Sequence, residues 1–118
     1  MRLPYLRHAV VPRDKVEGYL LSEAHPDGRA KAGFFRGFGF SADDWELLRE
    51  ALLAHVREHH VATVDTSAFG TRYTVEGRLR CPDGREPRVR SVWFVDSAST
   101  TPRLVTAYPH RKERDDDS

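Results

Sequence analysis

The most regular hydrophobic pattern in the chain lies between Ser41 and His59. Its apolar residues recur at spacings of three and four, as Trp45, Leu48, Leu52 and Val56, which places them on one stripe of a helix. Ser41 and Asp44 have the spacing of a capping box, and acidic residues crowd the first turn, where the helix dipole favours negative charge. The pattern therefore predicts a helix over residues 41–59 with one buried face.

After His60 the period of the pattern changes to two, which is typical of strands. Strands are predicted over residues 61–67, 71–81, 86–95 and 102–108, with turns at 68–70 and 82–84 and a loop at 96–101. The Pro-Asp-Gly turn at 82–84 favours a hairpin. Within the second strand, one face carries Tyr73, Val75, Gly77 and Leu79, and the other carries Arg72, Thr74, Glu76, Arg78 and Arg80.

Helices followed by an antiparallel meander predict the α+β class. We expect the N-terminal helices to pack on one face of a four-stranded antiparallel sheet and the arginine-bearing face to stay partly open. Phe34, Phe35, Phe38 and Trp93 are expected in the core.

The first part of the chain has weaker patterns. Residues 1–14 are predicted to be irregular, residues 15–22 a short apolar element, residues 24–28 a His-Pro-Asp-Gly turn, and residues 29–36 a short helix ended by glycines. The charged residues at 111–118 are expected to form a disordered tail. The length of 118 residues suits one domain spanning 1–118.

Composition excludes several classes of protein. Hydrophobic residues make up 39% and charged residues 31%, as in a soluble globular protein. No apolar run approaches the roughly 20 residues needed to cross a bilayer, and no secretory signal is visible, so we expect no membrane partner. The single cysteine, Cys81, rules out a disulfide framework and a cysteine-based zinc site.

The formal net charge of +1 conceals an uneven distribution. Residues 71–111 hold eight arginines and four acids, a net charge of +4, whereas residues 41–58 hold five acids and two arginines, a net charge of −3. Arginine presents a planar fork that matches phosphate oxygens. The distribution therefore favours a phosphate-bearing partner for the C-terminal half.

Several short motifs resemble an uncharacterised bacterial domain family that occurs alone in small gene pairs and at the C-terminal ends of polymorphic toxins. They are Lys15-x-x-x-Tyr19-Leu20-Leu21, His25-Pro26, Lys31-Ala32 and Phe34-Phe35, and FGTRYTVEG, RVRSVWFVD and PRLVTAYP continue the likeness to Pro109. The order of elements is also similar to the barnase–EndoU–colicin–RelE class of small ribonucleases.

This resemblance implies a toxin that cleaves RNA, possibly tRNA, in the cytoplasm, either its own or that of a target cell reached as part of a larger toxin. It also implies restraint by a small acidic antitoxin or immunity protein.

Metal-independent RNA cleavage needs a base, an acid, and cations that stabilise the phosphorane. His25 suits acid or base work because its ordinary pKa lies near 6.5, and Lys31 and Arg90 suit charge stabilisation. Thr106 and Tyr108 share a face of the last strand and suit positioning of a phosphate or base. These five are the candidate catalytic residues. Candidate substrate-binding residues are Lys15, Arg72, Glu76 and Arg88, of which Glu76 also suits a carboxylate base.

The same residues also have a structural interpretation. His25 then only shapes a turn, Lys31 is a solvated cation, and Arg88 and Arg90 line a polar strand face with cross-strand partners such as Glu76. On this hypothesis the chain is a non-enzymatic module that binds RNA or a protein partner through its arginine face.

His55 and His59 are four residues apart, a spacing that suits a shared metal ion. The glutamate of a H-E-x-x-H motif and a third ligand are missing, however. We therefore interpret them as part of a polar helix end, with positive side chains facing the negative pole of the helix, and predict no metal site and no cofactor.

Overall fold

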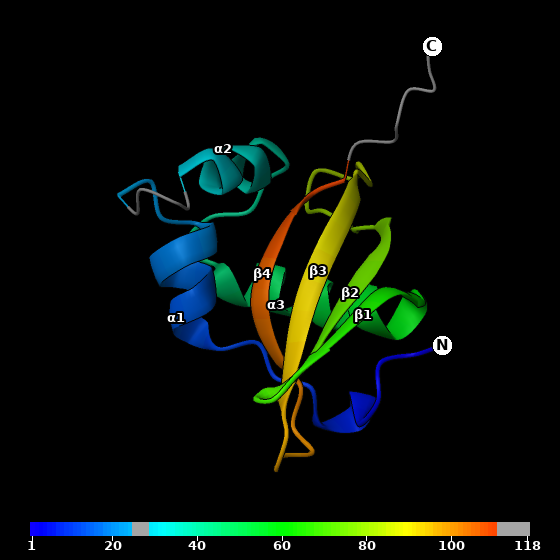
Figure 1. Cartoon of the computed structure of the whole chain (residues 1–118). Coiled ribbons are helices and arrows are strands. Elements are labelled where there is room, and N and C mark those ends of the chain that lie inside the picture. The colour runs from blue at the N-terminus through cyan, green and yellow to red at the C-terminus, as the bar shows by residue number, and fades with distance from the viewer. Residues whose placement is uncertain (25–28, 111–118) are drawn as a thin grey trace.

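Helix α3, Trp45–Glu58, lies across one face of a four-stranded antiparallel sheet (Figure 1). The computed structural model describes residues 1–24 and 29–110. In these residues the helical segments come first: η1 Leu6–His8, α1 Arg13–Lys15, η2 Val16–Leu20, α2 Arg29–Gly37 and α3. The strands follow as β1 Val61–Ser67, β2 Gly70–Arg78, β3 Arg88–Asp96 and β4 Arg103–Pro109. The predicted α+β class and the antiparallel meander are confirmed.

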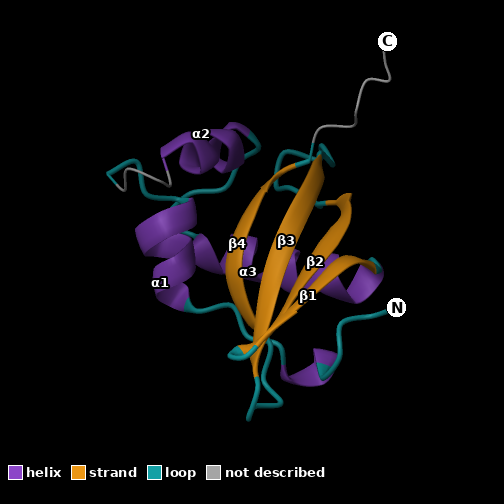
Figure 2. Ribbon diagram, viewed as in Figure 1, coloured by secondary structure: helices purple, strands orange, loops and turns teal. Residues whose placement is uncertain are grey.

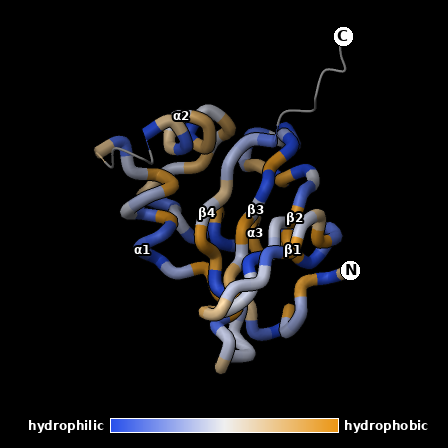
Figure 3. The backbone as a smooth tube through the Cα atoms, in the orientation of Figure 1, coloured by the Kyte–Doolittle hydropathy of each residue, from blue (hydrophilic) through white to orange (hydrophobic). Residues whose placement is uncertain are grey.

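The strand order is β1-β2-β3-β4, so neighbours in sequence are neighbours in space (Figure 2). α1, η2 and α2 sit beside the β4 edge of the sheet, while α3 runs behind it. Hydropathy alternates along the strands (Figure 3), as expected when one sheet face is buried and the other is open.

The apolar stripe of α3 packs against the inward face of β2, β3 and β4. The shared core contains Leu48, Leu52 and Val56 from the helix, and Val75, Val89, Trp93, Leu104 and Ala107 from the strands. The prediction that Phe35 and Trp93 are core residues is confirmed, since both are fully buried. Phe34 is partly buried against this core, and Phe38 is likewise half-buried.

The predicted start of the long helix is wrong, and so is the predicted capping box. The long helix begins at Trp45 rather than Ser41, and no side-chain cap is formed. The amide of Asp44 donates to the carbonyl of Ser41 at 3.2 Å, so the pair closes a turn ahead of the helix instead of a capping box. The acidic residues that were expected inside the first turn largely precede it.

The N-terminal segment is also more ordered than predicted. Val10 forms a parallel bridge with Arg103 of β4. The amide of Val10 donates to the carbonyl of Pro102, and the carbonyl of Val10 accepts from the amide of Leu104. Helix α1 begins at Arg13 and continues into the π-helical turn of η2. The tertiary pairing of residue 10 with β4 could not be seen in a local pattern, because its partner lies at the other end of the chain.

His55 is a core residue, which corrects the prediction of a polar helix end. It is 1% exposed, and its Nε2 lies 3.1 Å from the carbonyls of both Gly77 and Val89. Its Nδ1 lies 3.0 Å from the Ser91 hydroxyl, which in turn accepts from the Trp93 indole at 2.9 Å. Carbonyls only accept, so Nε2 carries the proton and Ser91 donates to Nδ1. Every polar atom of this network is satisfied.

No helix in the described ranges is both long and apolar enough to cross a membrane.

Candidate active site on the open sheet face

The sheet face turned away from α3, here called the open face, is crossed by rows of side chains in register. It comprises Asp65 of β1, Arg72, Thr74 and Glu76 of β2, Arg90, Val92 and Phe94 of β3, and Thr106 and Tyr108 of β4. One row runs Thr74–Val92–Thr106, and the next runs Glu76–Arg90–Tyr108. Three strands thus bring residues far apart in the sequence within reach of one ligand.

Arg90 is the centre of a polar cluster. Its Nε donates to Glu76 Oε2 at 2.7 Å, and its Nη2 lies 3.4 Å from Nε2 of His110. Burial alone would lower the pKa of Arg90, but hydrogen bonding to Tyr108 and to Glu76 raises it above its ordinary value. The guanidinium is thus held in place and charged. The predicted cross-strand pairing of Arg90 with Glu76 is observed.

His110 extends this cluster. The Arg90 guanidinium can only donate, so Nε2 of His110 accepts and Nδ1 carries the proton of the neutral ring. Nδ1 lies 3.8 Å from Glu76 Oε1, which is too long for a hydrogen bond. Among the described residues this buried Nδ1 has no hydrogen-bond partner, so it is the polar atom of the cluster that the fold itself does not satisfy.

Tyr19 joins the helical segment to the sheet. The Thr106 hydroxyl donates to the Tyr19 hydroxyl at 3.3 Å, and the ammonium groups of Lys15 and Lys31 each lie 5.5 Å from the centre of the Tyr19 ring. Both lysines are within cation–π range of the ring. Tyr19 thus contacts two cations from the helical segments through its ring and Thr106 of β4 through its hydroxyl.

A depression of about 410 Å³ lies on the open face. It is lined by Asp65, Arg72, Thr74, Val92, Val105, Thr106 and Tyr108. Arg72, Thr106 and Tyr108 among the predicted site residues therefore border one space. Thr106 links the depression to Tyr19, and Tyr108 links it to the Arg90 cluster.

The remaining predicted residues lie as follows. Arg88 faces Arg78 across the strands at the start of β3, and its carbonyl accepts from the amide of His110 at 2.9 Å, so it borders the Arg90 cluster. His25 lies outside the described residues, and its predicted role stays a prediction. The other candidates are connected in parts: Arg72, Thr106 and Tyr108 line one depression, Glu76 pairs with Arg90, and Lys15 and Lys31 share the ring of Tyr19, which contacts Thr106.

Sequence reasoning missed Tyr19, Asp65 and His110 at this site. Tyr19 follows Lys15 by four residues, the spacing of neighbours on a helix, and that signal was available. His110 continues the alternation of Thr106 and Tyr108, but the last strand was expected to end before it. Asp65 depended on the pairing of β1 with β2, which sets it opposite Arg72.

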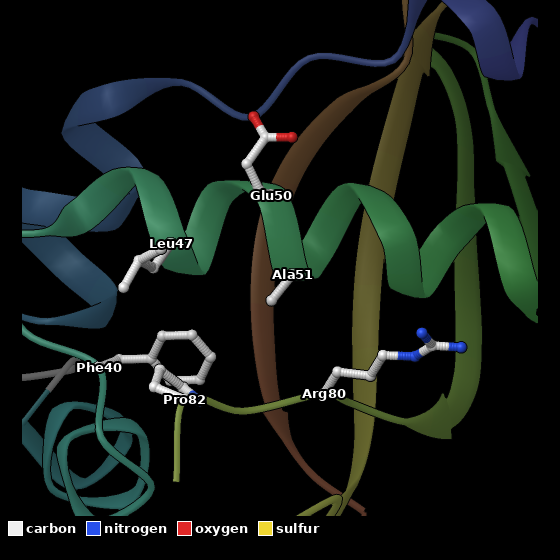
Figure 4. Close-up of a pocket in the computed structure, with 6 residues that line it drawn as sticks. All are labelled: Phe40, Leu47, Glu50, Ala51, Arg80 and Pro82. Atoms are coloured by element: carbon white, nitrogen blue, oxygen red, sulfur yellow. The ribbon is translucent and has the colours of Figure 1, made fainter. Parts of the chain in front are cut away.

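A second depression, of about 360 Å³, lies between the outer side of α3 and the end of β2 (Figure 4). Phe40, Leu47, Ala51 and Pro82 line it, with Glu50 and Arg80 at its rim. It contains none of the predicted residues and little polar chemistry. The described ranges also hold no group of three or more histidine, cysteine, aspartate or glutamate side chains arranged to bind a metal ion.

The chain belongs to a family defined by a domain of unknown function, DUF6883, which it matches over residues 2–111. No curated protein matches it in sequence. Its fold is similar to that of a chain in a solved structure, the contact-dependent growth inhibition toxin–immunity protein complex from Klebsiella pneumoniae 342. The two chains are 15% identical, with a TM-score of 0.70, over 92% of this chain and 98% of the other. At this identity the likeness shows a shared fold.

Proposed function

We propose that this chain is a toxin domain that cleaves RNA without a metal ion, at the open face. The observation that carries the proposal is the convergence of Lys15 and Lys31, through Tyr19, with Thr106 of the last strand. A guanidinium held by Glu76 lies on the same sheet face, in the row next to that of Thr106. A phosphodiester is the ligand that such a set of donors suits best.

In the proposed reaction the ribose 2′-hydroxyl attacks the adjacent phosphorus and loses its proton to a base. The bond to the 5′-oxygen breaks, and an acid protonates that oxygen, which leaves a 2′,3′-cyclic phosphate and a 5′-hydroxyl end. Lys31 and Arg90 stabilise the charge that develops on the non-bridging oxygens, and Thr106 and Tyr108 orient them. His25 transfers the proton, as its residue type and turn position suggest.

Glu76 is a poorer base than the sequence suggested, because its carboxylate already accepts a hydrogen bond from Arg90. We assign it instead to holding Arg90. His110, with its unsatisfied Nδ1, is the second histidine whose variant must be tested beside that of His25.

The toxin context rests on the shared fold with a chain of a toxin–immunity protein complex. A small acidic immunity or antitoxin protein that covers the open face would restrain the activity, since the C-terminal half of the chain is basic. The target RNA would then be reached in the cytoplasm, either directly or after delivery as part of a larger toxin.

The test is cleavage of purified bacterial tRNA by the chain in EDTA, with the ends of the products identified. Wild type should give 2′,3′-cyclic phosphate ends, and Lys31→Ala, Arg90→Ala and His25→Ala should each lower the rate by about a hundredfold or more. Arg49→Ala is the matched control, because Arg49 lies on α3 and its side chain is 36% exposed, against 38% for Arg90.

Intact tRNA at micromolar wild-type chain would contradict catalysis. If the tRNA is bound but not cut, and Arg90→Ala weakens that binding, the proposed function becomes non-enzymatic RNA binding in place of RNA cleavage. Equal losses in Arg49→Ala and Arg90→Ala would remove the assignment of the site to the open face.

A further inference from the structure

The depression on the open face has the composition of a site for a flat, partly polar ring. Val92 and Val105 supply its apolar surface, Thr74 and Thr106 supply hydroxyls, and Tyr108 supplies an aromatic ring. Its volume of about 410 Å³ lies within the range of small-molecule sites. Unstacked nucleobases in single-stranded RNA are bound on surfaces of this kind.

The floor of the depression is fixed by the sheet. Val92 is 5% exposed but does not belong to the core shared with α3, because it points to the opposite face. It is paired with Thr74 on one side and Thr106 on the other. The floor of the site is therefore built on three adjacent strands, whose positions the hydrogen bonds of the sheet hold, rather than on loops.

One side of the depression carries two opposite charges next to each other. Asp65 of β1 is paired directly with Arg72 of β2, and both line the depression. A carboxylate accepts two parallel N–H bonds, and a guanidinium donates two. Their combination matches a ring that has two donors on one edge and two acceptors on the next.

We propose that this depression is a guanine-binding subsite beside the phosphate-binding residues. Guanine offers N1–H and N2–H₂ to the Asp65 carboxylate, and its O6 and N7 accept from Arg72. Adenine has an amino group where guanine has O6, and no donor at N1, so it loses bonds at both residues. Cytosine and uracil lack this combination of two adjacent donors on one edge and two adjacent acceptors on the next.

The subsite shares Thr106 and Tyr108 with the proposed catalytic surface. Thr106 contacts Tyr19, which holds the two lysines, and Tyr108 is paired with Arg90. A guanine in the depression thus places its own 3′-phosphate near the cations. The inference rests on the proposed function and specifies its substrate as RNA cut on the 3′ side of guanosine.

The experiment measures binding of the four nucleoside 3′-monophosphates to the intact chain by calorimetry, with no cleavage required. 3′-GMP should bind about tenfold or more tightly than 3′-AMP, 3′-CMP and 3′-UMP. Asp65→Asn should bring 3′-GMP within about twofold of the others, because the amide replaces one acceptor by a donor. Asp96→Asn, at the end of β3 and outside the depression, makes the same charge change and should leave the preference intact.

Sequencing of the cleavage sites in tRNA is the second measurement. Wild type should cut after guanosine, and Asp65→Asn should cut with this preference reduced. Equal binding of all four nucleotides, no binding, or a guanine preference that survives Asp65→Asn overturns the subsite. If tRNA is cut without regard to guanosine, the proposed nuclease stands and the subsite falls. If 3′-GMP binds through Asp65 but tRNA is never cut, the guanine-binding subsite stands and the proposed nuclease activity falls.

Discussion

His55 packs against the covered face of the sheet and His110 lies on the open face, and the two residues differ in burial and in hydrogen bonding. On the face covered by α3, His55 is 1% exposed and makes hydrogen bonds through both ring nitrogens. On the open face, His110 contacts Arg90 through one nitrogen, and its other nitrogen has no hydrogen-bond partner among the described residues. The first network is closed on itself, whereas the second leaves polar groups for something else to bind.

This difference separates structural from ligand-directed polar residues. Burial lowers the pKa of His55 to about 4, against its ordinary 6.5, so the ring is neutral and inert at neutral pH. On the open face, hydrogen bonds to Tyr108 and Glu76 raise the pKa of Arg90 against the effect of burial, so this guanidinium stays charged. We therefore expect substitutions on the covered face to change stability, and substitutions on the open face to change activity.

The largest expected effect is that of His55→Ala. It removes the partner of Ser91 and of two buried carbonyls and leaves a cavity, which together should lower the free energy of unfolding by about 3–5 kcal/mol. Urea unfolding monitored by fluorescence of the two tryptophans measures this. His59→Ala is the control, since His59 is more exposed and its ring, which contacts that of His55, hydrogen-bonds a single carbonyl, that of Arg78, among the described residues. A loss below 1 kcal/mol for His55→Ala would mean that the covered-face network is dispensable.

The second effect is a loss of stability on acidification. In the unfolded chain His55 titrates near 6.5 and in the folded chain at about 4, so the unfolded state binds its proton first. The contribution of the neutral His55 ring to the free energy of unfolding is complete above about pH 6.5. It is lost as the pH falls to about 4, and the total loss is roughly 3 kcal/mol.

This is measured as the difference in unfolding free energy between wild type and His55→Gln from pH 7.5 to pH 4.5. The difference should shrink as the pH falls, because only wild type carries the titrating ring. An NMR titration in which the His55 ring protonates near pH 6.5 in the folded state would contradict the assignment.

The smallest effect on stability should come from Glu76→Gln on the open face. The side chains of Glu76 and Arg90 are 23% and 38% exposed. Ion pairs exposed to this extent contribute at most about 1 kcal/mol to stability. The same variant should lower tRNA cleavage by about tenfold or more, because Arg90 loses the group that positions it. A large change in stability with unchanged cleavage would invert the contrast between the two faces.

Much of the fold could be predicted because it follows local patterns. The stripe of Trp45, Leu48, Leu52 and Val56 and the alternation along β2 and β3 identify helix and strands without tertiary information. The position of His55 on the buried side could also have been read from that stripe, since it lies three residues after Leu52 and seven after Leu48.

The sequence suggests residue types for the candidate site but not how they assemble. Lys15 and Lys31 could be singled out in the sequence, but their common contact with Tyr19 depends on how η2 and α2 pack beside β4. Asp65 depended on strand register, which a shift of one residue would have turned to the other face. These are long-range properties that one sequence does not display.

The bridge between Val10 and Arg103 has a consequence for synthesis. Because β4 supplies Leu104 and Ala107 to the core and pairs with residue 10, a nascent chain that still lacks its last strand has nothing to close against. The core of the N-terminal half therefore stays incomplete, with apolar side chains exposed, until residues 103–109 emerge from the ribosome. We therefore expect the folded domain, and any activity that depends on it, to form only after residue 109 has emerged.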